Sequence, residues 1–353
     1  MAETNATILI PDISGFTEFM TSTELGHASH AINMLIDAML EAVGEEYEVS
    51  EIEGDAVLLI KKGPAPSKKE IVDTCIKIFN AFHFRRKWMQ QHTICPCGAC
   101  QAIIELSLKF VAHHGPLAEI KIGKFVKQSG PEMIVAHRLL KNSINNHEYL
   151  LLTEKLLEQA VDTPETLQLE WYSSSEEYAS IGKIDYRFLL LNEARSKVPE
   201  PPEPQNFYRT DNSSFLEINI DANFHDVYMV IMDIPGRYKW LPGLNSVIQK
   251  QEYPGAFIGS THIFSFDDYE AVISPVRMNA TDDGIMYAES CKIKESNLSL
   301  VYEFVFKNTG KQSSIFAARI LNAGDTPLPE EVKIPLFQKL EKLAQQLKIH
   351  CEN

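Results

Sequence analysis

The stretch Ile10-Pro11-Asp12-Ile13-Ser14-Gly15-Phe16-Thr17 decides how the first half of this chain is interpreted. An apolar, β-prone run over residues 7–10 precedes it, so Asp12 is expected where a buried strand reaches the surface. Further along, Glu53-Gly54-Asp55 has the form of a hairpin turn. Two carboxylates beside glycines indicate a divalent metal site, because magnesium prefers such oxygens and completes its coordination with water and substrate phosphates. Alternatively, Asp12 is a helix N-cap and Asp55 an ordinary hairpin residue.

Length and composition suggest two globular domains. The chain has 353 residues, of which 44% are apolar and 23% charged, enough for two cores. No apolar run is long enough for a membrane span and no signal-peptide pattern opens the chain, so we expect a cytoplasmic protein. A net charge of -15 argues against nucleic acid or an anionic membrane as a general partner. The proline-rich residues 197–204 predict a linker over 196–206, between a first domain at 1–195 and a second at 207–353.

The first domain has an alternating pattern of helices and strands. Residues 18–43 predict one amphipathic helix with an irregular start, and residues 47–51 and 56–60 predict two strands around the Gly54 turn. Ser67 and Glu70 have the spacing of a capping box and predict a second helix. A strand over 103–111 and a helix from about Pro131 follow. This α+β order is the ferredoxin-like pattern with additions.

The two acidic motifs resemble the catalytic domain of class III nucleotidyl cyclases, the adenylate and guanylate cyclases, over roughly residues 5–195. In that family the first metal aspartate lies in a D-I-x-G-F-T string and the second in a G-D hairpin. The resemblance implies Mg or Mn at Asp12, Ile13 and Asp55, a purine nucleoside triphosphate as partner, and a homodimer with shared active sites. It also implies nucleotide contacts at Gly15, Phe16, Thr17 and Gly54, and the loop from Ser14 into the next helix would be an anion site.

Other family positions agree only in part. The place that selects the purine, lysine in adenylate and glutamate in guanylate cyclases, holds Glu51, whose carboxylate suits the donors of guanine. The second selecting place holds Lys127, which fits neither class. His114-Gly115 resembles the family's H-x-G segment, and residues 130–139 resemble its G-D-x-V-N-x-A-x-R-L helix. There Arg138 matches the catalytic arginine, whereas Ile134 replaces the ribose-orienting asparagine, a loss that would slow an in-line reaction. The alternative interpretation is that His137 and Arg138 are solvated helix residues.

A cysteine cluster interrupts the first domain near residues 92–100. Three thiolates and an imidazole could form a tetrahedral zinc site, at His92, Cys95, Cys97 and Cys100. The spacing lacks paired C-x-x-C knuckles, so a reduced, partly buried cysteine loop or a redox pair is the alternative.

The sequence of the second domain predicts a strand, short helices, a long antiparallel run of strands and a C-terminal amphipathic helix. This order resembles the α+β helix-grip fold of START-like and polyketide-cyclase-like (SRPBCC) proteins, over about residues 213–351. The resemblance implies a cavity for a hydrophobic small molecule, with Trp240, Phe264 and Tyr287 as lining candidates. Aromatic residues on strands also serve as plain core.

Two functions therefore compete. The first is a divergent, metal-dependent nucleotidyl cyclase-like protein, with weak cyclic nucleotide synthesis, regulated by the ligand-binding second domain. The second is a catalytically inactive signalling or scaffold protein, whose START-like domain binds a lipid-like molecule or a protein. The aspartates Asp12 and Asp55 favour the first, whereas Ile134 and Lys127 favour the second.

Overall fold

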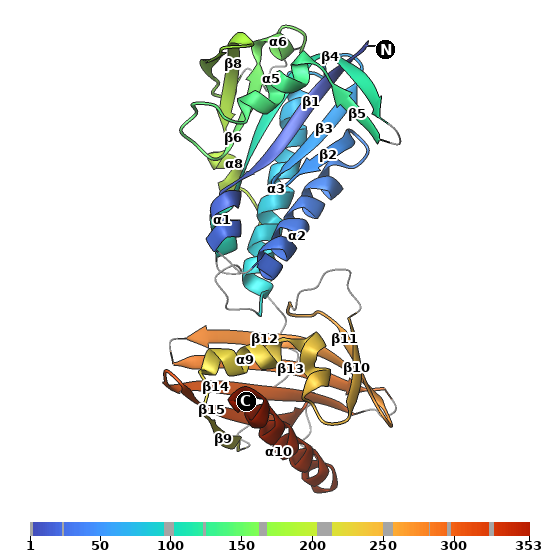
Figure 1. Cartoon of the computed structure of the whole chain (residues 1–353), viewed down its shortest axis with the longest axis vertical. Helices are drawn as coiled ribbons and strands as arrows, with labels where there is room; N and C mark the ends of the chain where they lie inside the picture. The colour runs from blue at the N-terminus through green and yellow to red at the C-terminus, as the bar shows by residue number, and fades with distance from the viewer. Residues whose placement is uncertain are drawn as a thin grey trace. The chain divides into compact units, whose positions relative to one another are not determined.

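The structure, a computed structural model, describes residues 3–22, 25–94, 102–122, 125–161, 168–202, 214–249, 257–281, 283–294, 298–324 and 328–353. The chain divides into two units (Figure 1). The first comprises Met1–Gln90 and Gln101–Pro201, and the second comprises Gln91–Cys100 and Pro202–Asn353. Among the helices within the described ranges, none combines the length and apolarity needed to cross a bilayer.

The strand β1 (Glu3–Ser14) lies in the interior of an eight-stranded sheet. It pairs antiparallel with β3 (Ala56–Lys62) on one side and with β4 (Ser107–Ile122) on the other, and β2 (Glu48–Glu53) lies outside β3. Helices connect β1 to β2 and β3 to β4, namely α1 (Phe16–Ser22), α2 (Leu25–Val43) and α3 (Lys68–His92). The order β2-β3-β1-β4 with these crossovers is a βαββαβ arrangement.

Beyond β4, the sheet continues in the order β6-β8-β7. The strand β6 (Tyr149–Thr153) runs parallel to it, and β8 (Gly182–Leu190) and β7 (Tyr172–Tyr178) follow as an antiparallel pair. The strand β5 (Phe125–Ser129) folds back on the outer end of β4. Short helical segments connect these strands, namely η1 (Ile103–Glu105), α5 (Pro131–Leu139), α6 (Glu154–Leu157) and α8 (Asn192–Ser196).

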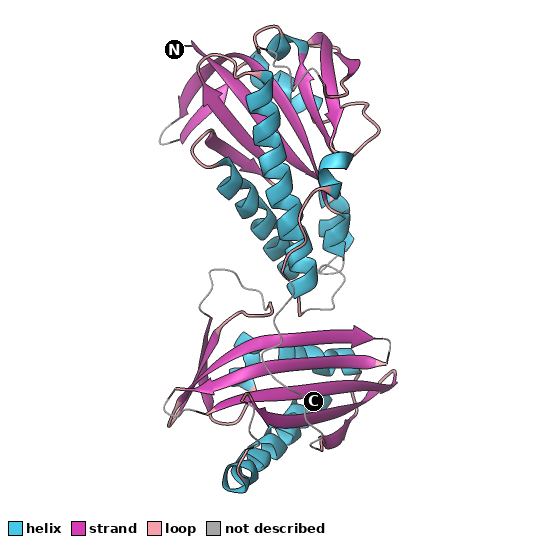
Figure 2. Cartoon of the chain, turned by 180° about the vertical axis from the view of Figure 1, so that it is seen from behind, coloured by secondary structure: helices cyan, strands magenta, loops and turns pink. Residues whose placement is uncertain are grey.

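The two faces of the first sheet are covered by different helices. Figures 1 and 2 show α2 and α3 on one face and α5 on the other. Alternate residues Ala6, Ile8 and Ile10 of β1 pack with Met133 and Ala136 of α5. Because side chains alternate along a strand, Asp12 belongs to this α5 face.

Several predictions from the sequence can be compared with these elements. The α+β class is confirmed, and the capping box at the start of α3 is present, since Glu70 Oε2 accepts from Ser67 N at 2.7 Å and Ser67 Oγ accepts from Glu70 N at 3.2 Å. The single helix predicted over 18–43 is wrong, because α1 and α2 are separate. The strand predicted from Ile103 starts only at Ser107, after η1.

A buried polar network joins β4 to α5 and α6. His113 contacts Thr153 Oγ1 at 2.8 Å through Nδ1 and Glu132 Oε2 at 2.5 Å through Nε2. Lys155 donates to the other oxygen of Glu132 at 2.6 Å. Gly115 makes room for this carboxylate, because a Cβ at that position would lie 2.8 Å from Glu132 Cγ. His114 is also buried and contacts Thr7 Oγ1 at 2.9 Å, so this pair of histidines belongs to the core.

The second unit is built on a seven-stranded antiparallel sheet in the order β10-β11-β12-β13-β14-β15-β9. Its strands are β9 (Leu216–Ile220), β10 (Leu244–Gln249), β11 (His262–Phe266), β12 (Glu270–Thr281), β13 (Gly284–Ile293), β14 (Ser299–Gly310) and β15 (Ser313–Asn322). The helices α9 (Phe224–Met232) and α10 (Glu330–Glu352) lie on the face toward the viewer in Figure 1, and Figure 2 shows the opposite face. The segment η2 (Ile234–Lys239) follows α9.

The helix α10 closes the core of this unit. Its buried residues Leu336, Leu340, Ala344 and Leu347 recur at three- and four-residue intervals, which places them on one face. They join strand residues such as Phe304 in two hydrophobic clusters. Hydrophobic burial therefore holds the helix against the sheet.

Residues 92–94, at the end of α3 and directly after it, pack with the second unit. His92 O accepts from Ile258 N at 2.9 Å, and Thr93 forms a β-bridge with Phe257. Ile94 is fully buried, and its carbonyl accepts a hydrogen bond from the Tyr228 hydroxyl. The core of the second unit thus draws on two separate parts of the chain.

A buried ion pair fastens η2 to β13. Arg237 donates to both oxygens of Glu289 at 2.8 Å, and its Nε donates to Ile231 O at 2.7 Å. Tyr287 adds a third hydrogen bond to Glu289 at 2.9 Å. The two charged side chains are only 4% and 5% exposed, so each depends on the other for compensation.

We expect Glu289→Gln to lower the free energy of unfolding by about 3–5 kcal/mol, because it leaves the Arg237 guanidinium buried without its counter-charge. The double variant Arg237→Met/Glu289→Met should regain most of that loss. Urea unfolding followed by tryptophan fluorescence measures both.

The matched control is Glu217→Gln, which breaks an ion pair with Lys307 whose side chains are 50% and 47% exposed. We expect it to change the free energy of unfolding by less than about 1 kcal/mol. Equal effects of the buried and exposed substitutions would refute the role given to Arg237 and Glu289.

Candidate functional site

Asp12 lies near the end of β1, on the α5 face of the first sheet. Its backbone neighbours are Ala56 on β3 and Lys109 on β4. Only 8% of the residue is exposed, an unusual degree of burial for an aspartate. The β1 register therefore carries a carboxylate into the protein interior, where it needs a partner.

Asp55 comes to the same place through the β2–β3 turn. Its backbone carbonyl accepts a hydrogen bond from Ile13 N at 3.0 Å. Gly54 has a φ of 68°, a conformation that favours glycine and lets the chain turn directly before Asp55. Backbone pairing of β1 with this hairpin thus brings the two predicted metal aspartates together.

Lys109 provides the positive charge at this site. Its ammonium lies 3.0 Å from Asp12 Oδ2 and donates to Leu140 O, just after α5, at 3.1 Å. The side chains of Lys109 and Asp12 are 19% and 11% exposed, respectively. The contact therefore lies where the screening by water that weakens surface ion pairs is reduced.

Burial has the largest effect on the pKa values of both aspartates, and Lys109 opposes it. Burial raises the pKa of Asp12, Lys109 opposes this shift, and the negative charge of Asp55 adds to it. Burial also raises the pKa of Asp55, with opposition from its own backbone hydrogen bond and from Lys109. The cluster thus has an excess of negative charge, which a further cation would relieve.

Gly15 and Phe16 of the first motif directly follow β1. Phe16 opens α1, and its ring lies 3.8 Å from the position that a Gly54 Cβ would take. Gly15 has a φ of 87°, and its carbonyl accepts from Phe19 N at 3.0 Å. The helix that follows has seven residues with Glu18 in its first turn. It is therefore a poor anion site, and Lys109 is the better source of positive charge.

The two predicted purine-selecting residues meet each other. Lys127 Nζ on β5 lies 2.9 Å from Glu51 Oε2 on β2, and their side chains are 58% and 26% exposed. A second contact links the same hairpin to α5, where His137 Nδ1 lies 3.5 Å from Glu53 Oε2. A carboxylate and an ammonium side by side present acceptors and donors to a planar base.

The remaining predicted residues on α5 lie apart from the aspartates. Ile134 is 55% exposed, and Arg138 is exposed as well. The described contacts of Arg138 include no hydrogen bond or ion pair to Asp12 or Asp55; its carbonyl accepts from the Tyr178 hydroxyl at 2.9 Å. A single copy of the chain thus does not join Arg138 to the carboxylates.

Of the predicted zinc ligands, Cys95, Cys97 and Cys100 lie outside the described residues. His92 is described and buried. Within the described ranges, no three His, Cys, Asp or Glu side chains gather as a ready-made metal cage. A cation at Asp12 and Asp55 would accordingly need other ligands, as magnesium obtains from water and phosphates.

Sequence reasoning missed Lys109, although the sequence contained a signal. Lys109 interrupts a run of buried residues from Leu106 to Phe110. A lysine at such a position requires an anion nearby. Its partner, however, lies on β1, and only the β1–β4 register identifies it.

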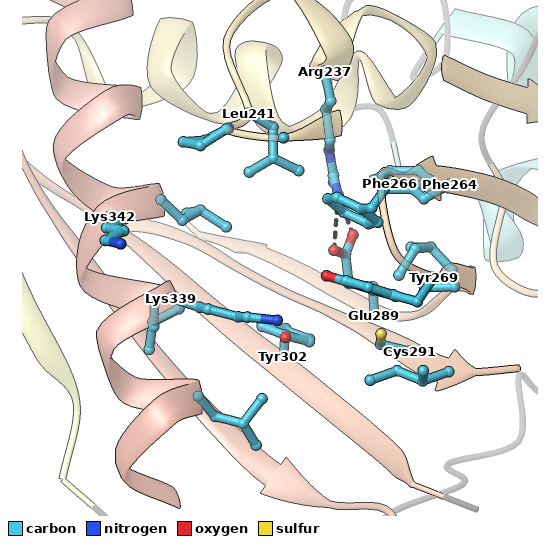
Figure 3. Close-up of a pocket in the computed structure, with 18 of the residues that line it drawn as sticks. Arg237, Leu241, Phe264, Phe266, Tyr269, Glu289, Cys291, Tyr302, Lys339 and Lys342 are labelled. Atoms are coloured by element: carbon cyan, nitrogen blue, oxygen red, sulfur yellow. Dashed lines mark hydrogen bonds and ion pairs between the residues drawn. The ribbon is translucent and has the colours of Figure 1, made fainter. Parts of the chain in front are cut away.

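The second unit contains a cavity of about 400 Å³ between α10 and the sheet (Figure 3). Two of the three predicted lining residues, Trp240 and Phe264, line it. Tyr287 is not among the lining residues but bonds to Glu289, which is. The cavity is within the size range of small-molecule sites.

Comparison with known proteins gives matches of several kinds. A family described as "Protein of unknown function (DUF2652)" matches residues 32–149. "Uncharacterized protein Rv2561/Rv2562" of Mycobacterium tuberculosis (strain ATCC 25618 / H37Rv) is 28% identical over 174 residues, which span 49% of this chain and 79% of that protein.

Solved structures similar to the chain include three nucleotidyl cyclases. The guanylyl cyclase Cya2 has 14% identity and a TM-score of 0.38, covering 57% of this chain and 95% of that one. A bacterial light-regulated adenylyl cyclase has 17% identity and a TM-score of 0.39, covering 55% and 93%. The guanylyl cyclase domain of the RhoGC fusion protein from the aquatic fungus Blastocladiella emersonii has 13% identity and a TM-score of 0.38, covering 54% and 98%. Identities and scores this low establish no shared activity, so function has to be argued from side-chain contacts.

Proposed function

We propose that the first unit is a divergent class III nucleotidyl cyclase-like unit, which binds a purine nucleoside triphosphate with a divalent cation. The observation that carries this proposal is the meeting of Asp12 and Asp55 with a single ammonium, that of Lys109. Two incompletely compensated carboxylates attract a cation, and a lysine beside them attracts phosphate.

The donor set fits Mg or Mn. Asp12 and Asp55 offer hard carboxylate oxygens, and the backbone of Ile13 lies between them through its bond to Asp55 O. When bound, such a cation would neutralise phosphate charge and polarise the phosphoryl oxygens. Burial raises the pKa of both aspartates, and a bound cation would oppose this shift because it favours the ionised carboxylates.

The other residues of the site have proposed tasks in nucleotide binding. Lys109 would exchange part of its contact with Asp12 for a phosphate oxygen. Gly15, Phe16, Thr17 and Gly54 would border the nucleotide. Glu51 and Lys127 would read the base, with Glu51 accepting from the N1-H and amine of guanine and Lys127 donating to O6, which favours GTP over ATP.

Cyclic nucleotide synthesis would be weak in this site. The reaction joins the ribose 3′-oxygen to the α-phosphorus, breaks the bond to the bridging oxygen and releases pyrophosphate. Ile134 has no amide to orient the ribose, and Arg138 does not reach the aspartates within one copy of the chain. We propose a homodimer, in which Arg138 of one copy supplies positive charge to the site of the other.

A catalytically inactive signalling or scaffold role is the second candidate. The exposed apolar side chain of Ile134 and the Glu51–Lys127 ion pair favour it.

In either role, the cavity of the second unit would bind a hydrophobic small molecule that regulates the first unit, as in START-like helix-grip proteins. The observation that supports this part is the 400 Å³ cavity beneath α10. We place the protein in the cytoplasm on composition alone.

We expect the full-length protein to bind GTP in calorimetry with Mn²⁺ present, and Asp12→Asn and Asp55→Asn each to weaken binding at least tenfold. The reason is that each variant removes one of two anionic cation ligands. Asp73→Asn on α3 is the matched control, because Asp73 pairs with Lys69 at the surface. Equal binding by all three variants, or none by the wild type, would overturn the proposed site.

The purine preference is tested with Glu51→Gln. An amide cannot accept from both guanine donors as a carboxylate does, so we expect the ratio of GTP to ATP affinity to fall about tenfold, or about 1.4 kcal/mol. Competition with a fluorescent nucleotide measures this ratio. If Glu51→Gln weakens GTP and ATP equally, Glu51 does not select the base.

Lys109→Met should destabilise the protein in a pH-dependent way. The folded-state pKa values of Asp12 and Asp55 are raised, so stability falls as pH rises from the unfolded value of 3.8 through the folded values. The positive charge of Lys109 limits this loss of stability, and the Lys109→Met substitution makes the loss larger. We expect a deficit of about 1–3 kcal/mol at pH 7.5 and a smaller one at pH 4.5, measured by urea unfolding.

The control for this experiment is Lys121→Met on the same strand, whose side chain is 71% exposed and pairs with Glu119. It should cause a small deficit that does not grow with pH. A deficit of Lys109→Met that is equal at both pH values would contradict the electrostatic coupling to the aspartates.

A further inference from the structure

The cavity of the second unit combines apolar walls with a few polar groups. Its walls include Leu241 after η2, Phe264 and Phe266 on β11, and Leu336 and Leu340 on α10. Figure 3 shows Lys339 extending from α10 into this space and Tyr302 rising from the sheet opposite. An occupant must therefore be mostly apolar and must satisfy a small number of polar groups.

The deepest charges of the cavity are already satisfied. The Arg237 guanidinium and the Glu289 carboxylate neutralise each other, and Glu289 also accepts from Tyr287. Both side chains are about 95% buried or more. This pair can shape the cavity floor, but it offers a ligand no net charge.

Two hydrogen-bond donors remain without an acceptor. The Lys339 ammonium lies 4.9 Å from the centre of the Tyr269 ring, and it forms no ion pair with another described residue. Tyr302 likewise has no hydrogen-bond partner for its hydroxyl among those residues. Burial raises the pKa of Tyr302 well above its usual range, so this hydroxyl keeps its proton and can donate.

Two acidic residues, Asp267 and Asp268, also line the cavity. Asp267 and Asp268 lie in the exposed turn between β11 and β12, and Asp267 already accepts from Asn245 at 2.8 Å. Lys342 on α10 adds a second cation to the lining. Lys339 and Lys342 are exposed as well, but Figure 3 shows the Lys339 side chain extending into the cavity. The donors that face an apolar occupant are thus Lys339 and Tyr302.

We infer that the cavity takes an apolar molecule with one terminal carboxylate, which accepts hydrogen bonds from Lys339 and Tyr302. A carboxylate has acceptors only, so it complements two donors that lack an acceptor, and a charge-assisted hydrogen bond is stronger than a neutral one. This inference rests on the proposed ligand-binding role of the second unit and specifies the class of ligand.

The test compares three ten-carbon probes that share an apolar chain and differ in head group, namely decanoate, decanol and decylamine. Each is titrated below its micelle concentration into the full-length protein, and binding is followed by calorimetry and by the shift in melting temperature. We expect decanoate to bind at least tenfold more tightly than decanol, and decylamine to bind most weakly.

Variants then locate the head group. Lys339→Met should weaken decanoate binding at least tenfold and leave decanol binding unchanged, and Tyr302→Phe should weaken decanoate by a smaller factor. Lys333→Met is the matched control, because Lys333 lies on the same helix outside the cavity and pairs with Glu330 at 2.9 Å. It should leave all three affinities unchanged.

The outcomes separate this inference from the role on which it rests. Equal binding of decanoate and decanol, or equal weakening of both by Lys339→Met, would overturn the carboxylate assignment while the ligand-binding role stands. Tightest binding of decylamine would also overturn it and would point to Asp267 and Asp268. Binding of none of the three probes would refute both the ligand-binding role and the carboxylate assignment.

Discussion

A carboxylate that leaves water has to meet a cation or several hydrogen-bond donors, and this constraint organises both units. Each unit buries acidic side chains, and each provides basic partners from a strand or helix distant in sequence. The pairs are Asp12 with Lys109, Glu132 with Lys155 and His113, Glu148 with Arg195, Glu289 with Arg237, and Glu303 with Arg319. These partners come together only in the folded chain. Charge compensation therefore helps to select the register of the strands and the positions at which the short helices pack.

The buried acids differ in how completely their charge is compensated. Glu289 meets a two-pronged guanidinium and a tyrosine hydroxyl, so nothing further is needed. Asp12 and Asp55 share one ammonium, and burial raises the pKa of both carboxyl groups in spite of it. An evolved protein tolerates such imbalance where a ligand relieves it. The first pair is thus a structural connection, whereas the second is the place where we propose that a cation binds.

The sequence was most informative where chemistry is local. The string around Asp12, the turn at Gly54 and the capping box at Ser67 each contain their own physical reason within a few residues, and the α+β class followed from the order of such signals. Long-range pairing was inaccessible: Lys109 could be recognised as a partner of Asp12 only through the β1–β4 register. The prediction of one helix over residues 18–43 was wrong, because no proline or glycine in residues 16–24 indicates that α1 and α2 are separate helices.

The position of Ile94 limits how this protein can be divided. Its side chain fills part of the core built by residues after Pro202, and its carbonyl accepts the Tyr228 hydroxyl. A gene fragment that began after the proline-rich stretch would therefore lack a piece of its own interior. A protease cut in that stretch would still leave the two units joined through the chain on either side of residues 91–100. A fragment that preserves this contact must therefore contain residues 91–94 in addition to residues 202–353.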